Sequence, residues 1–284
     1  GFTYKLNASR RSWNYKAMSF NSSKSLSGIA NSGQGSGYIE YKDNVEYQLS
    51  NILHYNLNLA EKNHFNVTGV YEITSSEYND FRNSASRIPS DILGIYGLES
   101  AFLNTPEIGG NERSLISFAG KLEYVFDSKY YFTVSGRADG SSVFGANNKW
   151  GFFPAVNAAW NVSNEEFMKE FKWITALKLR ATYGVNGNID QSTTPYVTAT
   201  RRNDNLYQSL QYTNITGQPN PMLRWEKTQS TNFGVDYSLF RGKLNGSIDI
   251  YRKYSSDLLA TTDLDPTVGA LSRRINAGAL MNKG

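Results

Sequence analysis

The chain has 284 residues, 14% of them aromatic, with no cysteine and a formal net charge of +4. The absence of cysteine excludes a disulfide framework and any thiolate metal site, and the scattered Lys and Arg form no basic block of the kind that binds nucleic acid. No window approaches the roughly 18 consecutive apolar residues of a transmembrane helix. The sequence opens in strand-like residues without a signal peptide, so we expect a piece of a longer precursor.

Apolar and polar side chains alternate along about ten segments, which is the pattern of half-buried β-strands. In chain order, the clearest segments are 47–59, 65–73, 115–126, 130–139, 151–162, 174–185, 224–240 and 243–260. Many reach the roughly 9–11 residues that a tilted strand needs to cross a bilayer. The mean hydropathy of −0.49 is compatible with this interpretation, because a barrel strand shows lipid an apolar residue only at every second position.

The connections between these segments alternate in length. Tight turns are predicted at residues 61–64, 127–129 and 241–242. Long polar loops are predicted at roughly 11–36, 83–113, 140–150, 186–223 and 261–272. Transmembrane barrels have short turns on the periplasmic side and long loops on the outer side. The alternation therefore predicts an all-β, antiparallel transmembrane barrel with a defined inside and outside.

One periplasmic connection is longer than the others and is predicted to hold one or two helical turns on the barrel rim. Ser163 and Glu166 match a capping box, with Ser163 as N-cap and Glu166 reaching back to its amide. Aromatic residues lie near the same predicted rim, at Tyr124, Tyr130, Tyr131, Trp160 and Trp173. They are typical of the aromatic girdle of a membrane interface, although aromatic residues are also common in strands generally.

Few side chains offer catalytic or metal-binding chemistry. His54 and His64 are the only histidines, and neither has a second ligand at metal spacing. The glycine-rich residues 33–37 precede a strand rather than a helix, so a loop is favoured over a phosphate site. Glu165 and Glu166 are neighbours that do not face each other across a cleft, as a general acid/base pair would. We therefore expect no enzyme, no metal and no cofactor.

Three tyrosines in the long loops are candidate substrate contacts: Tyr96, Tyr207 and Tyr212. Aromatic faces stack on sugar rings and on peptide side chains, but loop aromatics also pack against neighbouring loops. The corner that begins at Asp139 and Gly140 allows two interpretations. A functional one places it in the substrate path, whereas turn chemistry, with Ser141 and Ser142 hydroxyls capping amides, makes it structural. We favour the structural interpretation.

Residues 136–168 read GRADGSSVFGANNKWGFFPAVNAAWNVSNEEFM. This stretch resembles the signature of the SusC/RagA family of TonB-dependent outer-membrane transporters. The matching positions are Arg137, Asp139, Gly140, Ser141, Ser142, Phe144, Gly145, Trp150, Gly151, Pro154 and Trp160. Further motifs follow in family order, including residues 177–188, 225–236 and 249–259, and NAG and MNKG near the end. The resemblance covers roughly residue 115 onward and is weaker over residues 1–113.

The resemblance implies that residues 1–284 are an internal fragment of a 22-stranded barrel, without the N-terminal plug domain and the C-terminal strands. It implies import of oligosaccharides or peptides across the outer membrane of a Gram-negative bacterium. The implied partners are a SusD-like surface lipoprotein, the TonB complex through the missing plug, outer-membrane lipid and the cargo. The alternative is a soluble β-rich carbohydrate-binding module, in which one strand face is buried against a second sheet. An outer-membrane enzyme would need a catalytic cluster that the sequence does not offer.

Overall fold

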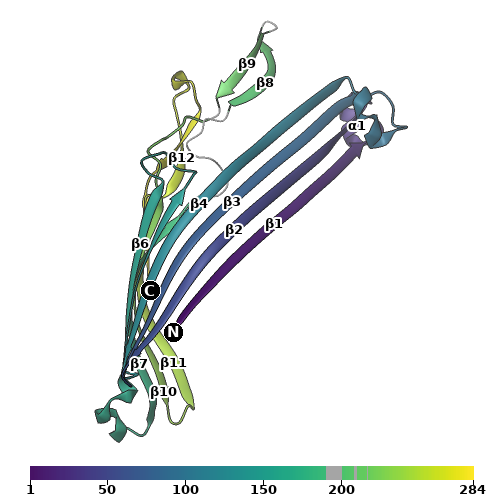
Figure 1. Cartoon of the computed structure of the whole chain (residues 1–284). Helices are drawn as coiled ribbons and strands as arrows, with labels where there is room; N and C mark the ends of the chain where they lie inside the picture. Colours follow the sequence, from purple (N-terminus) through teal and green to yellow (C-terminus); the bar gives the residue numbers. More distant parts are fainter. Residues whose placement is uncertain (190–199, 208–209, 216) are drawn as a thin grey trace. The chain divides into compact units, whose positions relative to one another are not determined.

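The structure is a computed structural model that describes residues 1–189, 200–207, 210–215 and 217–284. Its main element is a ten-stranded sheet in which strands that follow each other in the chain are neighbours (Figure 1). In sheet order the strands are β1 (Phe2–Asn21), β2 (Gly35–Leu59), β3 (Asn63–Ile88), β4 (Leu103–Phe126), β5 (Tyr130–Ser141), β6 (Trp150–Asn161), β7 (Ile174–Asn188), β10 (Glu226–Leu239), β11 (Leu244–Ser256) and β14 (Ala279–Lys283). From β4 to β14 every pairing is antiparallel, so the predicted fold class is confirmed.

Two hairpins and a few short helices interrupt the sequence of sheet strands. The hairpins are β8 (Thr200–Tyr207) with β9 (Leu210–Ile215), and β12 (Leu259–Asp263) with β13 (Ser272–Asn276). The helices are α1 (Leu26–Ala30) and the 3-10 turns η1 (Gly94–Ser100), η2 (Val162–Asn164), η3 (Glu166–Glu170) and η4 (Pro266–Val268). Within the described ranges, every helix is too short or too polar to cross a membrane.

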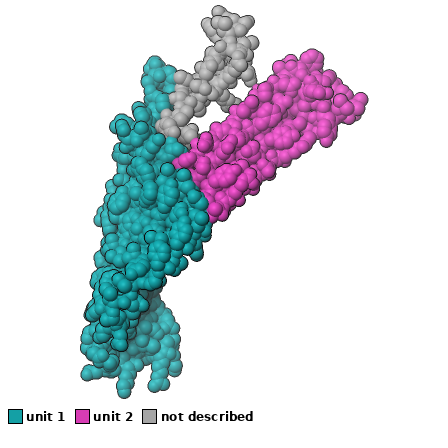
Figure 2. All heavy atoms as spheres, in the orientation of Figure 1, with its two compact units in different colours: residues 1–7, 49–73, 115–284 teal, residues 8–48, 74–114 magenta. Residues whose placement is uncertain are grey.

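The chain divides into two compact units, which are described separately (Figure 2). Unit 1 comprises residues 1–7, 49–73 and 115–284, and unit 2 comprises residues 8–48 and 74–114. In unit 2, Ala85, Ile88 and Leu98 form a small buried core.

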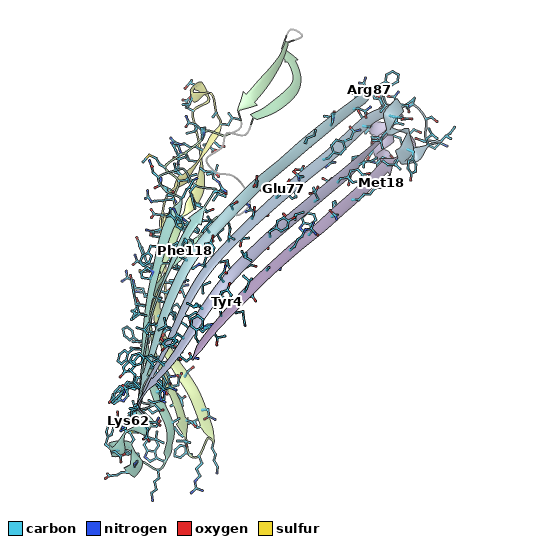
Figure 3. All side chains as sticks on the ribbon, viewed as in Figure 1. Tyr4, Met18, Lys62, Glu77, Arg87 and Phe118 are labelled. Atoms are coloured by element: carbon cyan, nitrogen blue, oxygen red, sulfur yellow. The ribbon has the colours of Figure 1, made fainter. Side chains whose placement is uncertain are left out.

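The strand register of unit 1 separates an apolar face from a polar face. One row across the sheet joins Tyr124, Phe132, Ala158, Ala181, Phe233 and Ile250. The adjacent row, one residue away on each strand, joins Glu123, Thr133, Asn157, Thr182, Asn232 and Tyr251. Because successive side chains point to opposite faces, the two rows lie on opposite sides of the sheet. The large apolar side chains of the first row, such as Phe132, Phe233 and Ile250, are exposed. Phe118, which lies on the same face of β4 as Tyr124, is exposed as well (Figure 3).

The three tight connections of unit 1 lie along one edge of the sheet, as predicted. The amide of Asp127 donates to the carbonyl of Lys62 (2.8 Å), which joins the first turn to the second. The amide of Phe240 donates to the carbonyl of Trp173 (2.7 Å), which joins the third turn to the η3–β7 connection. Between them, the Asn161 amide donates to the carbonyl of Lys129 (2.7 Å). Short turns at one edge are typical of a transmembrane barrel.

The predicted capping box between Ser163 and Glu166 is wrong. Two separate 3-10 turns replace the expected helix, and Glu165 lies between them in extended conformation without a side-chain cap. Ser163 is therefore inside the first turn and cannot cap the second, and Glu166 pairs with Lys169 at 2.7 Å instead. The N-cap position of η3 is occupied by Glu165.

Glu165 fastens the turn edge to two aromatic side chains. Its Oε1 accepts hydrogen bonds from the Tyr130 hydroxyl (2.6 Å) and the Trp160 indole (3.1 Å), and its Oε2 lies 3.4 Å from Lys129 Nζ. These donors stabilise the ionised carboxylate and lower its pKa. Tyr130 also stacks between Trp160 and Phe126, with ring centroids 6.3 and 6.2 Å away.

Two predicted loops are shorter than expected. Residues 11–21 belong to β1, and residues 83–88 and 103–113 belong to β3 and β4. In residues 103–113, polar side chains occupy both faces. In residues 11–21, the apolar positions change from odd numbers (Trp13 and Tyr15) to even ones (Met18 and Phe20), so the alternation is interrupted. Aromatic–cation pairs line the strands here instead, such as Lys42 Nζ 5.6 Å from the Tyr15 ring centroid and Arg82 4.2 Å from that of Tyr38. The loops predicted at 140–150 and 261–272 lie where β5–β6 and β12–β13 connect.

Candidate functional site

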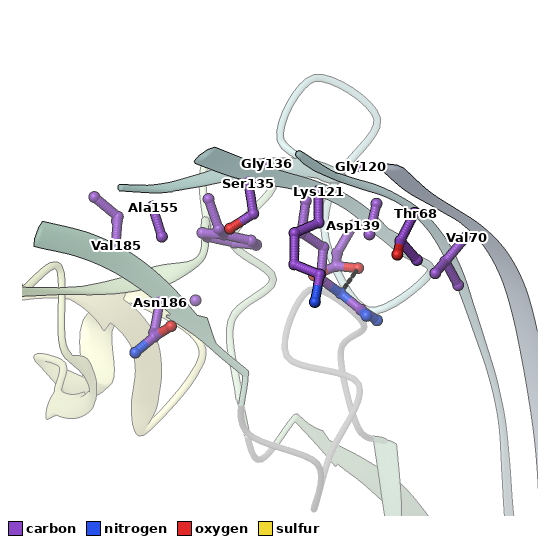
Figure 4. Close-up of a pocket in the computed structure, with 14 residues that line it drawn as sticks. Thr68, Val70, Gly120, Lys121, Ser135, Gly136, Asp139, Ala155, Val185 and Asn186 are labelled. Atoms are coloured by element: carbon purple, nitrogen blue, oxygen red, sulfur yellow. Dashed lines mark hydrogen bonds and ion pairs between the residues drawn. The ribbon is translucent and has the colours of Figure 1, made fainter. Parts of the chain in front are cut away.

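A pocket of about 380 Å³ lies on the polar face of unit 1 and is formed by strands β3 to β7 (Figure 4). Its lining includes Thr68, Lys121, Ser135, Arg137, Asp139, Phe153, Ala155 and Asn186. Lys121, Ser135 and Arg137 reach the same face because they occupy every second position of paired strands, with Lys121 opposite Ser135 in register. The pocket combines two cations, an acid, hydroxyls, an amide and one aromatic ring, which suits a polar ligand that carries both donors and acceptors.

Arg137 is held by three groups at the pocket wall. Its Nε donates to both carboxylate oxygens of Asp139 (2.7 and 2.9 Å), and its Nη2 donates to the Ser117 hydroxyl (2.8 Å). Glu72 lies 3.6 Å from the same Nη2 and accepts a hydrogen bond from Ser50 (2.7 Å). Charge-assisted hydrogen bonds of this kind fix the geometry of the guanidinium. The guanidinium of Arg137 is therefore held in one position at the pocket wall, next to the carboxylates of Asp139 and Glu72.

A second charged cluster lies on β7, β10 and β11. Arg180 Nε and Nη2 donate to the two carboxylate oxygens of Asp236 (2.7 and 2.8 Å), and Asp249 lies 3.2 Å from Nη2. Gly234 allows this approach, because a Cβ there would lie 2.7 Å from the Arg180 guanidinium carbon. The polar face is thus lined by paired charges well beyond the pocket, as expected of a surface that faces water.

The loop between β5 and β6 is anchored on the segment that precedes β10. Its Val143 and Phe144 are buried together with Phe153, Leu223 and Trp225. The Phe144 and Phe153 ring centroids lie 5.2 and 5.4 Å from that of Trp225.

Backbone contacts hold this anchored cluster together. The Trp225 indole donates to the carbonyl of Lys149 (3.0 Å), and the Asn148 amide side chain donates to the carbonyl of Pro221 (3.2 Å). Gly145 packs directly on Pro221, because a Cβ at Gly145 would lie 2.3 Å from the Pro221 carbonyl oxygen. A residue other than glycine would push the two segments apart.

The predicted positions of the family signature divide among three places. Arg137 and Asp139 line the pocket, and Phe144 and Gly145 belong to the anchored loop. The buried Ser141 accepts a hydrogen bond from the amide of Val143 (3.3 Å), and Ser142 lies in the same loop.

The remaining signature positions belong to β5 and β6. Gly140 lies beneath the ring of Trp150, and Gly151 lies beneath that of Phe153. Trp150 itself is exposed and lies 6.1 Å from Phe118. The other two positions on β6 are Pro154, which is opposite Gly136 in register, and Trp160 at the turn edge.

Of the three candidate tyrosines, only Tyr96 can be compared with the pocket. Tyr96 is exposed in η1 of unit 2 and is not part of the lining. Tyr207 belongs to β8 and Tyr212 to β9, and their side chains lie outside the described residues. Sequence reasoning missed Lys121, Ser135 and Asn186 as lining residues. The alternation along each strand predicts on which face of the sheet these side chains lie. Only the register between the strands shows that they line the same pocket.

The family comparison matches the chain over its whole length. The model described as TonB dependent receptor-like, beta-barrel, matches residues 1–284. The chain belongs to the TonB-dependent receptor family. This is a family of Gram-negative outer-membrane receptors rather than enzymes. Within the described residues, no group of three or more His, Asp or Glu side chains is arranged to hold a metal ion.

Relatives and solved structures agree with the resemblance to SusC/RagA proteins. The chain is 31% identical to TonB-dependent receptor P39 of Formosa agariphila over 294 residues, which cover 100% of the chain and 27% of that protein. It is 33% identical to TonB-dependent receptor SusC of Bacteroides thetaiotaomicron over 180 residues, which cover 60% of the chain and 18% of SusC. The structure of the RagAB peptide transporter matches with a TM-score of 0.87 and 25% identity, covering 100% of this chain and 31% of that one. The chain thus spans less than a third of these relatives.

Proposed function

We propose that this chain forms part of the barrel wall of a TonB-dependent importer for oligosaccharides or peptides. The observation that carries the proposal is the two-faced sheet of unit 1, with exposed apolar rows on one side and the fixed charges of the pocket on the other. The apolar rows fit contact with lipid. The polar face, with Arg137 and Asp139, fits the wall of a water-filled lumen through which a polar cargo passes.

The complete receptor would have a 22-stranded barrel, and this chain would supply somewhat under half of its wall. A plug elsewhere in the receptor would be moved by TonB from the side of the short turns. On the opposite side, a SusD-like surface lipoprotein would cover the loops. The similarity to SusC and to RagAB supports an importer of this type, and the description of RagAB as a peptide transporter supports the peptide class of cargo.

The alternative of a soluble carbohydrate-binding module finds no support in the sheet. Such a module would bury one strand face against a second sheet, whereas Phe118, Phe132, Phe152 and Phe233 are all exposed on the apolar face. Exposed apolar surface of this extent is rare on soluble monomers.

Transport by the complete receptor in a Gram-negative host tests the proposal. The receptor should fractionate with outer membranes, and its uptake of labelled oligosaccharides or peptides should require TonB. Substituting Arg137→Gln should lower uptake several-fold at unchanged surface abundance, because Asp139 and Glu72 lose their shared cation. Lys62→Gln at the turn edge is the control and should leave uptake unchanged. Uptake that persists without TonB, or a receptor found outside the outer membrane, would contradict the proposal.

A further inference from the structure

A second hollow, of about 370 Å³, lies on the apolar face of unit 1 and is bordered by β5, β6, β7 and β10. The strand register explains its shape. One row across the sheet joins Phe132, Ala158, Ala181 and Phe233, so two alanines lie side by side between two phenylalanines. The small alanine side chains form the floor of a groove, and the rings of Phe132 and Phe233 form its walls. We call this hollow the alanine groove.

The alanine groove offers hydrocarbon rather than hydrogen-bonding groups. Tyr130 and Trp160 line its side nearer the turn edge, and both direct their polar atoms away to Glu165. The guanidinium of Arg180, which also borders the groove, donates to Asp236 on the polar face. A ligand in the groove would therefore meet methyl groups and aromatic rings.

Neither class of cargo fits such a lining. Oligosaccharides and peptides carry donors and acceptors that would lose their hydrogen bonds to water and find no partners in the groove. A hydrocarbon chain has no such groups and gains from the burial of its surface. The floor is two strands wide, at about 4.8 Å per strand, which is room for the two extended chains of one lipid side by side.

The position of the groove along the strands assigns it to one leaflet of a membrane. Ala158 is three residues from the end of β6 at Asn161, and Ala181 is seven residues from the start of β7 at Ile174. At about 3.3 Å per residue, Ala181 lies roughly 23 Å from the turn edge along its strand. A strand tilt of about 35–45° reduces this to a depth of roughly 16–19 Å, which is within half of a bilayer of about 40–45 Å. The groove thus lies in the leaflet on the side of the short turns.

The turn edge beside the groove carries the groups that a lipid headgroup would contact. Trp173 and Phe240 stack with ring centroids 6.0 Å apart and are 50% and 52% exposed. They are followed and preceded by cations, with Lys172 before Trp173 and Arg241 after Phe240. Phe240 and Arg241 both have positive φ (53° and 60°), which large side chains rarely adopt, so the tight turn displays two unusually large residues.

These groups lie at the ends of the strands that form the groove. Trp173 directly precedes β7, which carries Ala181, and Phe240 directly follows β10, which carries Phe233. Exposed aromatic rings beside Lys and Arg are typical of proteins at the level of lipid headgroups, where the cations attract phosphate. A lipid with its phosphate at Lys172 and Arg241 could therefore lay its chains along β7 and β10 into the groove.

We infer that the alanine groove is a binding site for one phospholipid of the leaflet on the short-turn side. Its two acyl chains lie on Ala158 and Ala181 between Phe132 and Phe233, and its phosphate lies at the turn edge. The inference rests on the proposed function, because it needs the apolar face of unit 1 to be in the membrane.

Native mass spectrometry of the complete receptor tests this inference. The receptor is stripped of lipid in detergent, supplied with phosphatidylethanolamine and diluted into fresh detergent. The wild type should retain one phospholipid molecule. The double variant Ala158→Leu and Ala181→Leu raises the floor of the groove, so it should retain roughly tenfold less or lower. Replacing the cations, in Lys172→Gln with Arg241→Gln, should lower retention several-fold while the groove stays open.

A matched control enlarges two side chains on the same face outside the groove. Val134 and Val156 are paired in register, are 56% and 45% exposed, and lie outside the lining. The variant Val134→Phe with Val156→Phe should therefore retain the phospholipid as the wild type does. All variants should melt at the temperature of the lipid-free wild type, since the substituted side chains lie at the surface.

Each other result overturns the inference. A wild type that retains no phospholipid, or a groove variant that retains as much as the wild type, would show that the groove holds no specific lipid. Undiminished retention after loss of the two cations would contradict the position of the phosphate. Purification with lipopolysaccharide in place of phospholipid would assign the groove to the other leaflet, and a native mass that halves in the groove variant would identify a second receptor copy as the occupant. All these outcomes leave the proposed function intact, because that proposal fails only on location or on dependence on TonB.

Discussion

Phe152 and Phe153 are adjacent aromatic residues of β6 whose side chains lie on opposite faces of the sheet, and they should respond very differently to truncation. Phe153 is 8% exposed and belongs to the cluster that anchors the β5–β6 loop, with its ring edge-on to Trp225. Phe152 is 63% exposed on the apolar face. We predict that Phe153→Ala releases the loop, whereas Phe152→Ala does not.

The magnitude follows from what surrounds each ring. The ring of Phe153 covers Gly151 and Gly187, and a Cβ at Gly187 would lie 2.0 Å from its Cζ atom. Two glycines cannot fill the space that the ring would leave, so the loss should reach about 4 kcal/mol, within the range for Phe→Ala in a core. Phe152 has only about a third of its surface covered, and its loss should cost about 1 kcal/mol. The difference of about 3 kcal/mol corresponds to roughly a hundredfold in the equilibrium for local opening.

Amide hydrogen exchange of residues 141–150 in the complete receptor measures this difference. Exchange in Phe153→Ala should be on the order of a thousandfold faster than in the wild type, with at most a several-fold change in Phe152→Ala, so the two variants should differ by roughly a hundredfold. Equal exchange in the two variants would refute the reasoning, because it would mean that the buried cluster does not hold the loop. Exchange across the turn edge at residues 127–129 serves as an internal control and should not change.

Three further predictions concern contacts outside this pair. Gly145→Ala should raise protease cleavage of the β5–β6 loop and cost about 1–3 kcal/mol, because its Cβ would meet the Pro221 carbonyl; unchanged cleavage would contradict the packing. Glu165→Ala should shift the fluorescence emission of Trp160, because it removes the carboxylate that accepts a hydrogen bond from the indole. An unchanged emission spectrum would argue against that hydrogen bond. Hydrogen bonds from Ser23 lower the pKa of Asp91. The ionised carboxylate therefore contributes fully to folding stability above the unfolded pKa of about 4, and this contribution is lost as the pH falls through the lower folded pKa. Cleavage of residues 22–34 and 89–102 by an acid-active protease should therefore rise only below about pH 4. The variant Asp91→Asn should remove this dependence of cleavage on pH.

The sequence alone determined the features that depend on neighbours along the chain. The alternation with period two assigned Phe132 and Val134 to one face and Arg137 to the other, because backbone geometry points successive side chains to opposite sides. The turn residues likewise placed the short connections correctly, and the signature stretch indicated the family. The same local reasoning failed for residues 11–21, where the apolar positions change from odd to even numbers within one strand and interrupt the alternation.

Only the tertiary structure decided the contacts between segments that are distant in sequence. The pocket needs the register that sets Lys121 opposite Ser135, and the anchored loop needs Gly145 to meet Pro221, which is more than 70 residues away. The tertiary structure also decided the role of Glu165. Its side chain makes no helix-capping hydrogen bond and instead accepts hydrogen bonds from Tyr130 and Trp160 at the turn edge. Such pairings follow from strand register and loop paths, which a single sequence does not specify, because many registers satisfy the same alternation.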